Sequence, residues 1–482
     1  MASSPLYDVI IVGSGAGGAA AAYRLALRGV NVLLLEKGAP LPHDGSTLDT
    51  TRVVTRGEFL SKEPWVDGRG NPICPEEHFN LGGKTKWYGA AVLRYSGAEF
   101  EADAAYCARG WPISAAELAP YYDEAERLLG VRTFACEPGL KVILERLSAF
   151  DPAWQSTPLP MALSADIWRN REEATHFDGF ASAANLKGDA EENFLKPVAG
   201  KSNLSIRTSA EVAELLPAHE FGPRIGGVRL KSGEELRAPA VFLAAGALHS
   251  PRLLGRYLST HAGLPNYPAL DAAGRNLKKH VLTALVAVSM SRQSDVLRKT
   301  MITTHDAHPH SSAQPLGFDA ELIATLIPKF VPRFLARIIG RHSYGFFLQT
   351  EDGSHPDNRV LERGEPPVRV MDYDPTRTPA SQAEHRSFTR AFKRALLRLG
   401  FISFTQRIGL NGTAHIDGSL IAGTDPSTAV VGANGAVFGI EGLYVVDGSV
   451  LPRSSRVNPS LTIYAWGLRV AELLADTMRP KT

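Results

Sequence analysis

The sequence predicts an α/β fold, with one part built on parallel strands alternating with helices and an α+β part built on a mostly antiparallel sheet. Two observations lead to this prediction. An apolar run at residues 7–12 precedes the glycine turn GSGAGG, an alanine-rich helical stretch and a second apolar run at residues 30–35. Alternating segments such as HVLTALVAV and YGFFLQTED follow between residues 276 and 404 and are typical of a sheet under a ligand.

The glycine turn is the first element with chemical meaning, because it follows a strand and opens a helix. In that context Gly13 permits a tight turn, Gly15 lets the backbone approach a pyrophosphate, and Gly18 lets the helix pack closely on the strand. Phosphates would then lie at the positive N-terminus of the helix. The unit therefore predicts a Rossmann-like dinucleotide-binding domain.

The second strand of this unit ends in an acidic residue. Glu36 lies at that end, placed to accept hydrogen bonds from an adenosine ribose, and Lys37 follows it. A carboxylate at this place disfavours a 2'-phosphate. FAD or NAD is therefore expected in preference to NADP.

Length and composition narrow the class of protein. At 482 residues, with 44% hydrophobic and 21% charged residues, the chain is expected to form two or three globular units of about 150 residues each. Lys and Arg total 52 against 50 Asp and Glu, so nothing in the net charge of +2 predicts a nucleic-acid partner. The longest apolar stretches are shorter than the roughly 18 residues that span a bilayer.

The cysteines and the N-terminus suggest a cytoplasmic setting. Cys74, Cys107 and Cys136 form no CxxC pattern, so neither a disulfide framework nor a metal site is expected. The N-terminal residues lack the pattern of a secretory signal.

Three later segments carry further signals. LGGKTKWYGAAVLRY, at residues 81–95, pairs glycines whose backbone can lie against a flat ring or a phosphate. HIDGSLIAGTDP begins at His415, and VVDGSVLPRSSRVNPSLTIYAWGLRVAELL follows it. Asn458 stands directly before Pro459, so on its own Asn458 is also a candidate helix cap.

In their order and over essentially the whole chain, these segments resemble the glucose-methanol-choline oxidoreductase family. Its members combine a GxGxxG start, a GG-containing flavin loop, an AAGA..SP segment, an HxxGT block and a terminal VVDxS....NP helix; AAGALHSP at residues 244–251 supplies the third. The resemblance implies FAD as the cofactor. It also implies an FAD-binding domain over residues 1–95, 180–275 and 405–482, and a discontinuous substrate-binding domain over 96–179 and 276–404.

The resemblance implies a catalytic pair, His415 and Asn458, over the reactive face of the flavin. This suits alcohol oxidation, because the hydroxyl must lose a proton while its carbon gives a hydride to flavin N5. His415 can take that proton near neutral pH, and Asn458 can hold the oxygen. The N-terminus of the closing helix, beginning near Pro459, would stabilise negative charge at flavin N1 and the C2 carbonyl.

The resemblance also implies the cofactor contacts. Asp447 corresponds to a contact with the ribityl or phosphate region, and Val212 to a backbone contact with adenine. The full expected set is Gly13, Ser14, Gly15, Ala16, Gly18, Glu36, Lys37, Gly83, Thr85, Tyr88, Gly89, Val212, Ala245, Gly246, Asp447, Asn458, Pro459 and Ser460.

The chain departs from the family pattern in two places. Family members commonly read HxxGTxRMG, whereas Ser419 to Gly423 lack the Arg-Met pair. Trp87 stands where some relatives attach FAD through a histidine, so non-covalent FAD is expected. Tyr88 replaces an asparagine that many members carry, which would alter the surroundings of flavin N5.

The expected activity is oxidation of a primary alcohol or of a sugar or glycoside hydroxyl, with oxygen, a quinone or a redox protein as electron acceptor. Two alternatives stay open: a non-redox lyase or decarboxylase that retains FAD, and a flavin subunit that passes electrons to a cytochrome or quinone partner. The apolar and basic segment 321–341 suggests a lid or a membrane-surface helix. Pro328 and Pro332 interrupt it, so membrane contact is not expected.

Overall fold

The centre of the computed structural model, which describes residues 7–219, 224–260, 271–327 and 331–478, is a five-stranded parallel sheet. All residues of its three middle strands are buried, which explains why their sequences are continuously apolar. The strands, in spatial order, are β6 (Leu204–Arg207), β2 (Val32–Leu35), β1 (Val9–Val12), β10 (Ala240–Leu243) and β20 (Leu443–Val445). The predicted α/β fold with a parallel sheet is confirmed.

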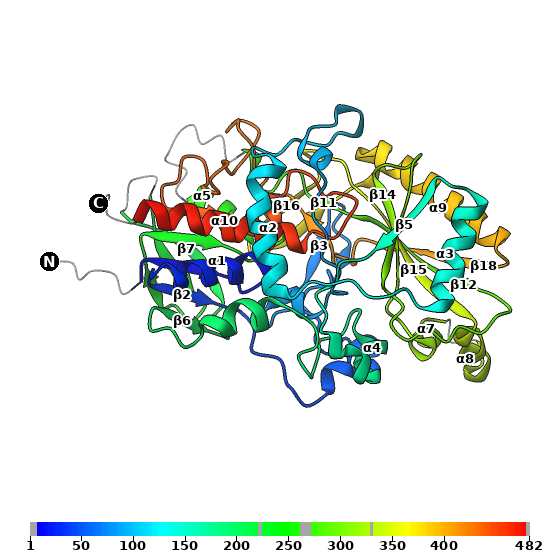
Figure 1. Cartoon of the computed structure of the whole chain (residues 1–482). Coiled ribbons are helices and arrows are strands. Elements are labelled where there is room, and N and C mark those ends of the chain that lie inside the picture. The colour runs from blue at the N-terminus through cyan, green and yellow to red at the C-terminus, as the bar shows by residue number, and fades with distance from the viewer. Residues whose placement is uncertain (1–6, 220–223, 261–270, 328–330, 479–482) are drawn as a thin grey trace.

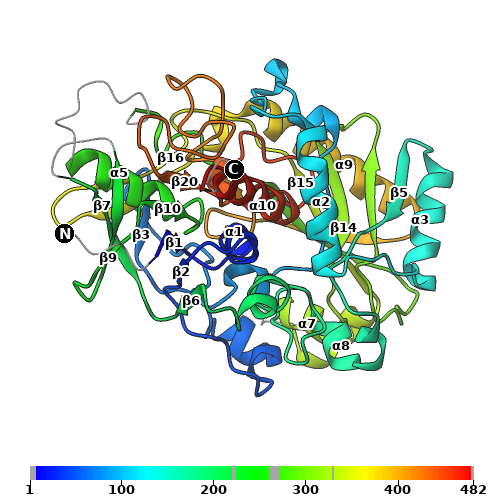
Figure 2. The same ribbon diagram turned by 60° about the vertical axis from the view of Figure 1, so that its left-hand side comes forward.

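Two helices from opposite ends of the chain lie side by side on this sheet, α1 (Ala16–Leu27) and α10 (Ser460–Met478) (Figures 1 and 2). Small residues permit the close approach. A Cβ at Gly467 would lie 2.6 Å from the carbonyl oxygen of Gly17, and one at Gly17 would lie 1.6 Å from that of Val446. The helix α2 (Ala115–Leu129) packs against α10 and begins with a capping box between Ser114 and Glu117.

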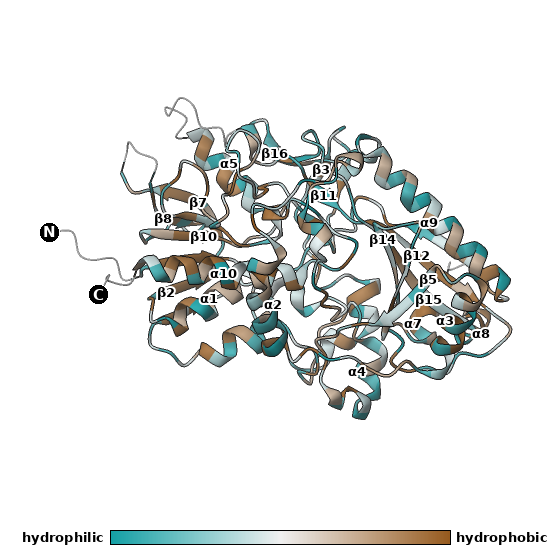
Figure 3. Ribbon diagram, turned by 45° about the horizontal axis from the view of Figure 1, so that its top comes forward, coloured by the Kyte–Doolittle hydropathy of each residue, from teal (hydrophilic) through white to brown (hydrophobic). Residues whose placement is uncertain are grey.

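A six-stranded antiparallel sheet forms the other half of the molecule. Leu285 and Phe346 on one of its faces pack with Phe388 and Phe392 of α9 (Pro379–Arg398), and α3 (Pro138–Phe150) joins the same core. In Figure 3, α9 alternates between hydrophilic and hydrophobic colours, as expected for a helix covered on one side. The spatial order is β18 (Ile402–Arg407), β12 (Val281–Val288), β15 (Ser343–Thr350), β14 (Ser311–Pro315), β13 (Met301–His305) and β5 (Trp154–Pro158).

Smaller sheets accompany the two large ones. The short strands β11 (Lys278–Lys279) and β19 (Ile416–Asp417) pair in antiparallel fashion and bring His280 beside His415. A mixed sheet contains β16 (Arg359–Arg363), β17 (Val368–Asp372), β3 (Trp65–Asp67) and β4 (Pro72–Ile73). A third contains β7 (Val212–Pro217), β8 (Ile225–Leu230) and β9 (Glu235–Arg237). The division into the two expected domains stays a prediction.

The segment 321–341 forms two short helices, α7 (Ala320–Leu326) and α8 (Arg333–Arg341), which both contact β15. Phe334 and Ile338 of α8 are exposed. Pro328 and Lys329 lie outside the described residues. Within the described ranges, no helix combines the length and the apolar character needed to cross a membrane. Among the described residues, the other α-helices are α4 (Arg171–His176) and α5 (Ser250–Thr260).

Candidate active site

A cavity of about 660 Å³ lies between the N-terminal ends of α1 and α10 and the antiparallel sheet. The strand ends, the glycine turn and the loop after residue 81 all contribute to its wall. It is lined by His415 and by all the expected cofactor contacts except Gly18. The structure therefore brings almost the whole predicted set together.

The glycine turn presents an open cradle at the N-terminus of α1. A Cβ at Gly15 would meet nothing within 4 Å, and the first turn of α1 has neither an acidic residue nor a side-chain cap. Its backbone N–H groups are therefore suited to an anion such as a pyrophosphate. Gly18 has the packing role expected of it, since a Cβ there would lie 2.0 Å from the carbonyl oxygen of Gly13.

Glu36 is held rigidly at the end of β2. Its carboxylate accepts hydrogen bonds from the backbone N–H of Ser14 (3.0 Å), the Ser14 hydroxyl (2.6 Å) and the backbone N–H of Gly38 (2.9 Å). Burial raises the pKa of Glu36, and the hydrogen bonds from Gly38 and Ser14 oppose that rise. The Ser14 hydroxyl also accepts from Gly82 N (3.0 Å) and is fully buried, so it positions Glu36 and the neighbouring loop.

Three other expected contacts have side chains that are engaged with protein groups. The Lys37 ammonium is paired with Glu63 and Glu211. Asp447 accepts from Gly246 N (2.8 Å) and Ser449 N (2.9 Å), and so fixes the backbone at the cavity wall. The Tyr88 hydroxyl donates to the Gly188 carbonyl, which directs its polar end away from the cavity.

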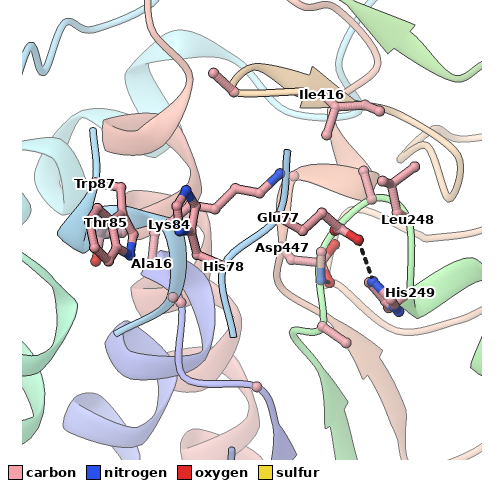
Figure 4. A pocket seen from close by; sticks show the side chains of 18 of the residues that line it. Ala16, Glu77, His78, Lys84, Thr85, Trp87, Leu248, His249, Ile416 and Asp447 are labelled. Carbon is pink, nitrogen blue, oxygen red and sulfur yellow. Dashed lines mark hydrogen bonds and ion pairs between the residues drawn. The ribbon is translucent and has the colours of Figure 1, made fainter. Parts of the chain in front are cut away.

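Aromatic and charged side chains form another part of the cavity wall (Figure 4). The Trp87 ring stacks on His78 with centroids 4.6 Å apart, and its indole N–H donates to Asn80 Oδ1 (3.0 Å). Glu77 is buried, yet the His249 imidazole 2.8 Å away holds its pKa at about 2. Figure 4 shows Lys84 extending between Trp87 and the Glu77–His249 pair.

His415 and Asn458 meet at the cavity, although they come from separate segments. Asn458 Nδ2 lies 3.2 Å from His415 Nε2, and Gln314 Nε2 donates to Asn458 Oδ1 (2.7 Å). Both atoms of the Asn458 amide are thus directed at neighbours in the cavity, as the catalytic interpretation requires. His415 and Asn458 are each partly exposed, so a small molecule in the cavity can reach them.

The environment of His415 keeps its ring neutral. Burial lowers the pKa of His415 well below the usual 6.5, and the neighbouring His280, Lys299 and Lys84 lower it further. A neutral imidazole is the form that can accept a proton. The site therefore holds His415 in the state needed for a base.

Sequence reasoning did not find several polar residues of the cavity, all contributed by the antiparallel sheet or its connections. Gln314 lies on β14 and Gln349 lies on β15. The side-chain amide of Gln349 donates to the Arg456 carbonyl (2.6 Å). Lys299 Nζ donates to Asp178 Oδ2 (3.0 Å). Only Gln349 lay in a segment that the sequence singled out, YGFFLQTED, and there only as part of an expected strand. The others are distant in sequence and meet only through strand pairing.

Comparison with known proteins agrees with this geometry. The family model described as FAD dependent oxidoreductase matches residues 8–364, and the one described as GMC oxidoreductase matches residues 363–467. Together they extend from β1 to α10, and they include the glycine turn and the His415–Asn458 pair. The fold and the site thus define an FAD-dependent oxidoreductase that acts on CH–OH groups.

The chain belongs to the glucose-methanol-choline oxidoreductase family. It is 30% identical to paromamine 6'-oxidase of Streptomyces fradiae over 98% of this chain and 92% of that protein. It is 29% identical to 6'''-hydroxyparomomycin C oxidase of Streptomyces lividus, with the same coverage of both proteins. The solved structure of pyridoxine 4-oxidase from Mesorbium loti has the same fold, with a TM-score of 0.70 at 19% identity over 97% of this chain and 99% of that one.

Proposed function

We propose that the chain oxidises a primary alcohol or a sugar or glycoside hydroxyl to a carbonyl, with His415 as the base and Asn458 as the group that holds the oxygen. The hydroxyl proton passes to His415 Nε2 while the C–H bond breaks and its electron pair leaves with the hydrogen as hydride. FAD, when bound, supplies the hydride acceptor. One proton and one hydride leave the substrate, which accounts for both electrons of the oxidation.

One observation carries this proposal: His415 Nε2 and Asn458 Nδ2 are 3.2 Å apart at the wall of one cavity. An acceptor and a donor at this separation can engage the same substrate oxygen. The donor holds the oxygen and stabilises the negative charge that develops on it, while the base removes its proton.

We propose that FAD is held non-covalently by the groups that line the cavity. The N-terminus of α1 suits the pyrophosphate, Glu36 the adenosine ribose, and the N-terminus of α10 the N1 and C2 carbonyl region of the flavin. The first turn of α10 contains no acidic residue, which supports that last role. Trp87 offers an indole where covalent attachment would need a histidine.

The cavity wall and the relatives support a polar substrate. Gln314, Gln349 and the Lys299–Asp178 pair lie in the same cavity as His415. Leu282, Phe347 and Ile408 supply an apolar side. Relatives matched over 98% of the chain are named for the oxidation of paromamine and of a hydroxyparomomycin. Among hydroxyl substrates, we therefore favour sugars and glycosides.

We propose a cytoplasmic enzyme whose reduced flavin is reoxidised by oxygen, a quinone or a redox protein. A lyase or decarboxylase that merely retains FAD would use the same histidine without net oxidation. A subunit coupled to a cytochrome or quinone would oxidise substrate but need its partner for turnover.

Anaerobic addition of substrates to the FAD-loaded protein separates these possibilities. The panel contains glucose, an alkyl glucoside, paromamine, a short aliphatic alcohol and benzyl alcohol. Bleaching of the oxidised flavin band by one of them is the expected result. Turnover with an unchanged band would overturn oxidation in favour of a lyase. After bleaching, oxygen consumption with peroxide release would identify an oxidase, whereas a persistent reduced band would point to another acceptor.

A further inference from the structure

His280 lies behind His415 and is fully buried, with hydrogen-bond partners on both ring nitrogens. Its Nε2 is 2.8 Å from the carbonyl oxygen of Ser454 and 2.9 Å from that of Ser455. Carbonyl oxygens only accept hydrogen bonds, so His280 Nε2 carries the proton. Burial lowers the pKa of His280, so its ring is neutral and its Nδ1 has a free lone pair.

The lone pair of His280 fixes the proton on the next ring. His280 Nδ1 lies 2.9 Å from His415 Nδ1, and two ring nitrogens at this distance must share one proton. Because His280 Nδ1 is the acceptor, His415 Nδ1 carries the proton. His415 Nε2, the atom that faces Asn458 and the cavity, is then the unprotonated nitrogen.

The other end of the chain of hydrogen bonds agrees with this assignment. Gln314 Nε2 donates to Asn458 Oδ1, so Asn458 presents its NH₂ group to His415 Nε2. That nitrogen must therefore accept. Every hydrogen bond in this series, from the Ser454 and Ser455 carbonyls to Gln314, then joins one donor to one acceptor.

From this geometry we propose that His280 is a positioning residue, which holds His415 in the tautomer whose Nε2 can act as a base. The proposal rests on the proposed role of His415. A histidine without such a partner divides between two tautomers, and the wrong one would present an N–H to the substrate hydroxyl. His280 differs from a carboxylate in this role, because it selects the tautomer without placing a negative charge beside the base.

Several backbone features of the fold hold His280 in place. Its backbone N–H donates to the His415 carbonyl (3.2 Å), next to the β11–β19 pair. Ser455 has a positive φ of 62°, a costly conformation for serine that orients its carbonyl toward His280. Glu99 stabilises this turn by accepting from the Arg456 N–H (3.0 Å) and from the Ser455 hydroxyl.

Two variants of the FAD-loaded enzyme test the proposal. His280→Leu and His280→Asn both lose the N–H that reaches the Ser454 and Ser455 carbonyls, but only the asparagine side chain keeps an acceptor near the place of Nδ1. We expect His280→Leu to lower kcat by roughly 10–100-fold, as loss of a partner that orients a functional histidine does, with KM little changed. His280→Asn should recover most of that loss.

Histidine ¹⁵N spectra supply a readout that general loosening of the site would not produce. In the wild-type enzyme His415 should show a protonated Nδ1 and an unprotonated Nε2, a pattern that His280→Asn should keep. In His280→Leu the two signals should move toward each other, because only the Asn458 contact then still favours the Nδ1–H form. A pure Nδ1–H pattern with wild-type kcat in His280→Leu would overturn the proposal.

Two outcomes separate this proposal from the one on which it rests. If His415→Ala keeps full activity, the role of His415 as base is wrong. If His415→Ala is inactive while both His280 variants match the wild type, only the positioning role is wrong. Should His280→Leu fail to fold, the decision rests on His280→Asn, where a protonated His415 Nε2 would overturn the proposal.

Discussion

His415 Nε2 and Asn458 Nδ2 lie 3.2 Å apart although 43 positions separate the two residues in the chain. His415 directly precedes β19, and Asn458 lies just before the first turn of α10. The segments just before β19 and α10 thus bring a proton acceptor and an amide donor together at the cavity wall.

His415→Ala should lower kcat by roughly 10²–10⁴-fold, the usual contribution of a positioned general base. FAD content should stay at the wild-type level, because the cofactor contacts lie mainly on other segments. Steady-state rates and the ratio of flavin to protein absorbance measure the two effects. His355→Ala is the matched control, since His355 lies outside the cavity lining. Near-normal turnover of His415→Ala would remove it from the mechanism.

Asn458→Ala should lower kcat by roughly 10²-fold or more, the usual effect of losing one donor to a developing negative charge. Gln314→Ala should have a smaller effect, because Gln314 acts on the reacting oxygen only through the Asn458 amide that it orients. The order of the two effects, measured as kcat/KM with one substrate, is the test. An effect of Gln314→Ala equal to or larger than that of Asn458→Ala would contradict the assignment of Asn458.

Two glycine substitutions should separate cofactor binding from folding. Gly15→Ala meets no protein atom within 4 Å, so the FAD-free protein should melt as the wild type does. Its methyl group would occupy the phosphate cradle, and the Kd for FAD should rise roughly tenfold or more, equivalent to at least about 1.4 kcal/mol.

Gly18→Ala is the matched control for that prediction. Its Cβ would lie 2.0 Å from the Gly13 carbonyl oxygen, so it should lower the free energy of unfolding by about 1–3 kcal/mol even without FAD. Thermal melting with and without added FAD distinguishes the two variants. Equal destabilisation of both FAD-free proteins would argue against the cradle.

The dependence of kcat on pH should reflect the neutral state of His415. Burial, with His280, Lys299 and Lys84 nearby, lowers the pKa of His415 below 6.5, and the neutral form is the base. Activity should therefore stay constant as the pH falls through 6.5 and decline only under more acidic conditions. A profile of kcat at saturating substrate tests this. A half-maximal rate above pH 6.5 would contradict it.

The local parts of the fold were predictable because their residues are contiguous. The β1–α1–β2 unit and the helix from Ser460 follow from glycine placement and apolar periodicity within short windows. The hydrogen-bond partner of Ser14 could not be predicted in this way: its hydroxyl is fully buried and donates to Glu36, while the residue also lies in the cavity wall.

The substrate side of the cavity could not be derived in this way. His280 becomes a neighbour of His415 through the β11–β19 pair, whereas Gln314 and Gln349 reach the cavity only because β12, β14 and β15 pair in one register. A shift of one residue would turn these side chains to the opposite face. Strand pairing of this kind cannot be predicted from a short motif. The proposed effect of His280 on the His415 tautomer therefore could not be inferred from the sequence.

The interleaving of the chain ends has a consequence for biosynthesis. Because β10 lies between β1 and β20, and α1 lies beside α10, a nascent chain cannot complete the cavity expected to hold FAD until β20 and α10 have left the ribosome. We therefore expect FAD to bind only after the segment through α10 has been synthesised. Chains arrested before residue 443, where β20 begins, should leave added flavin as fluorescent as it is in buffer.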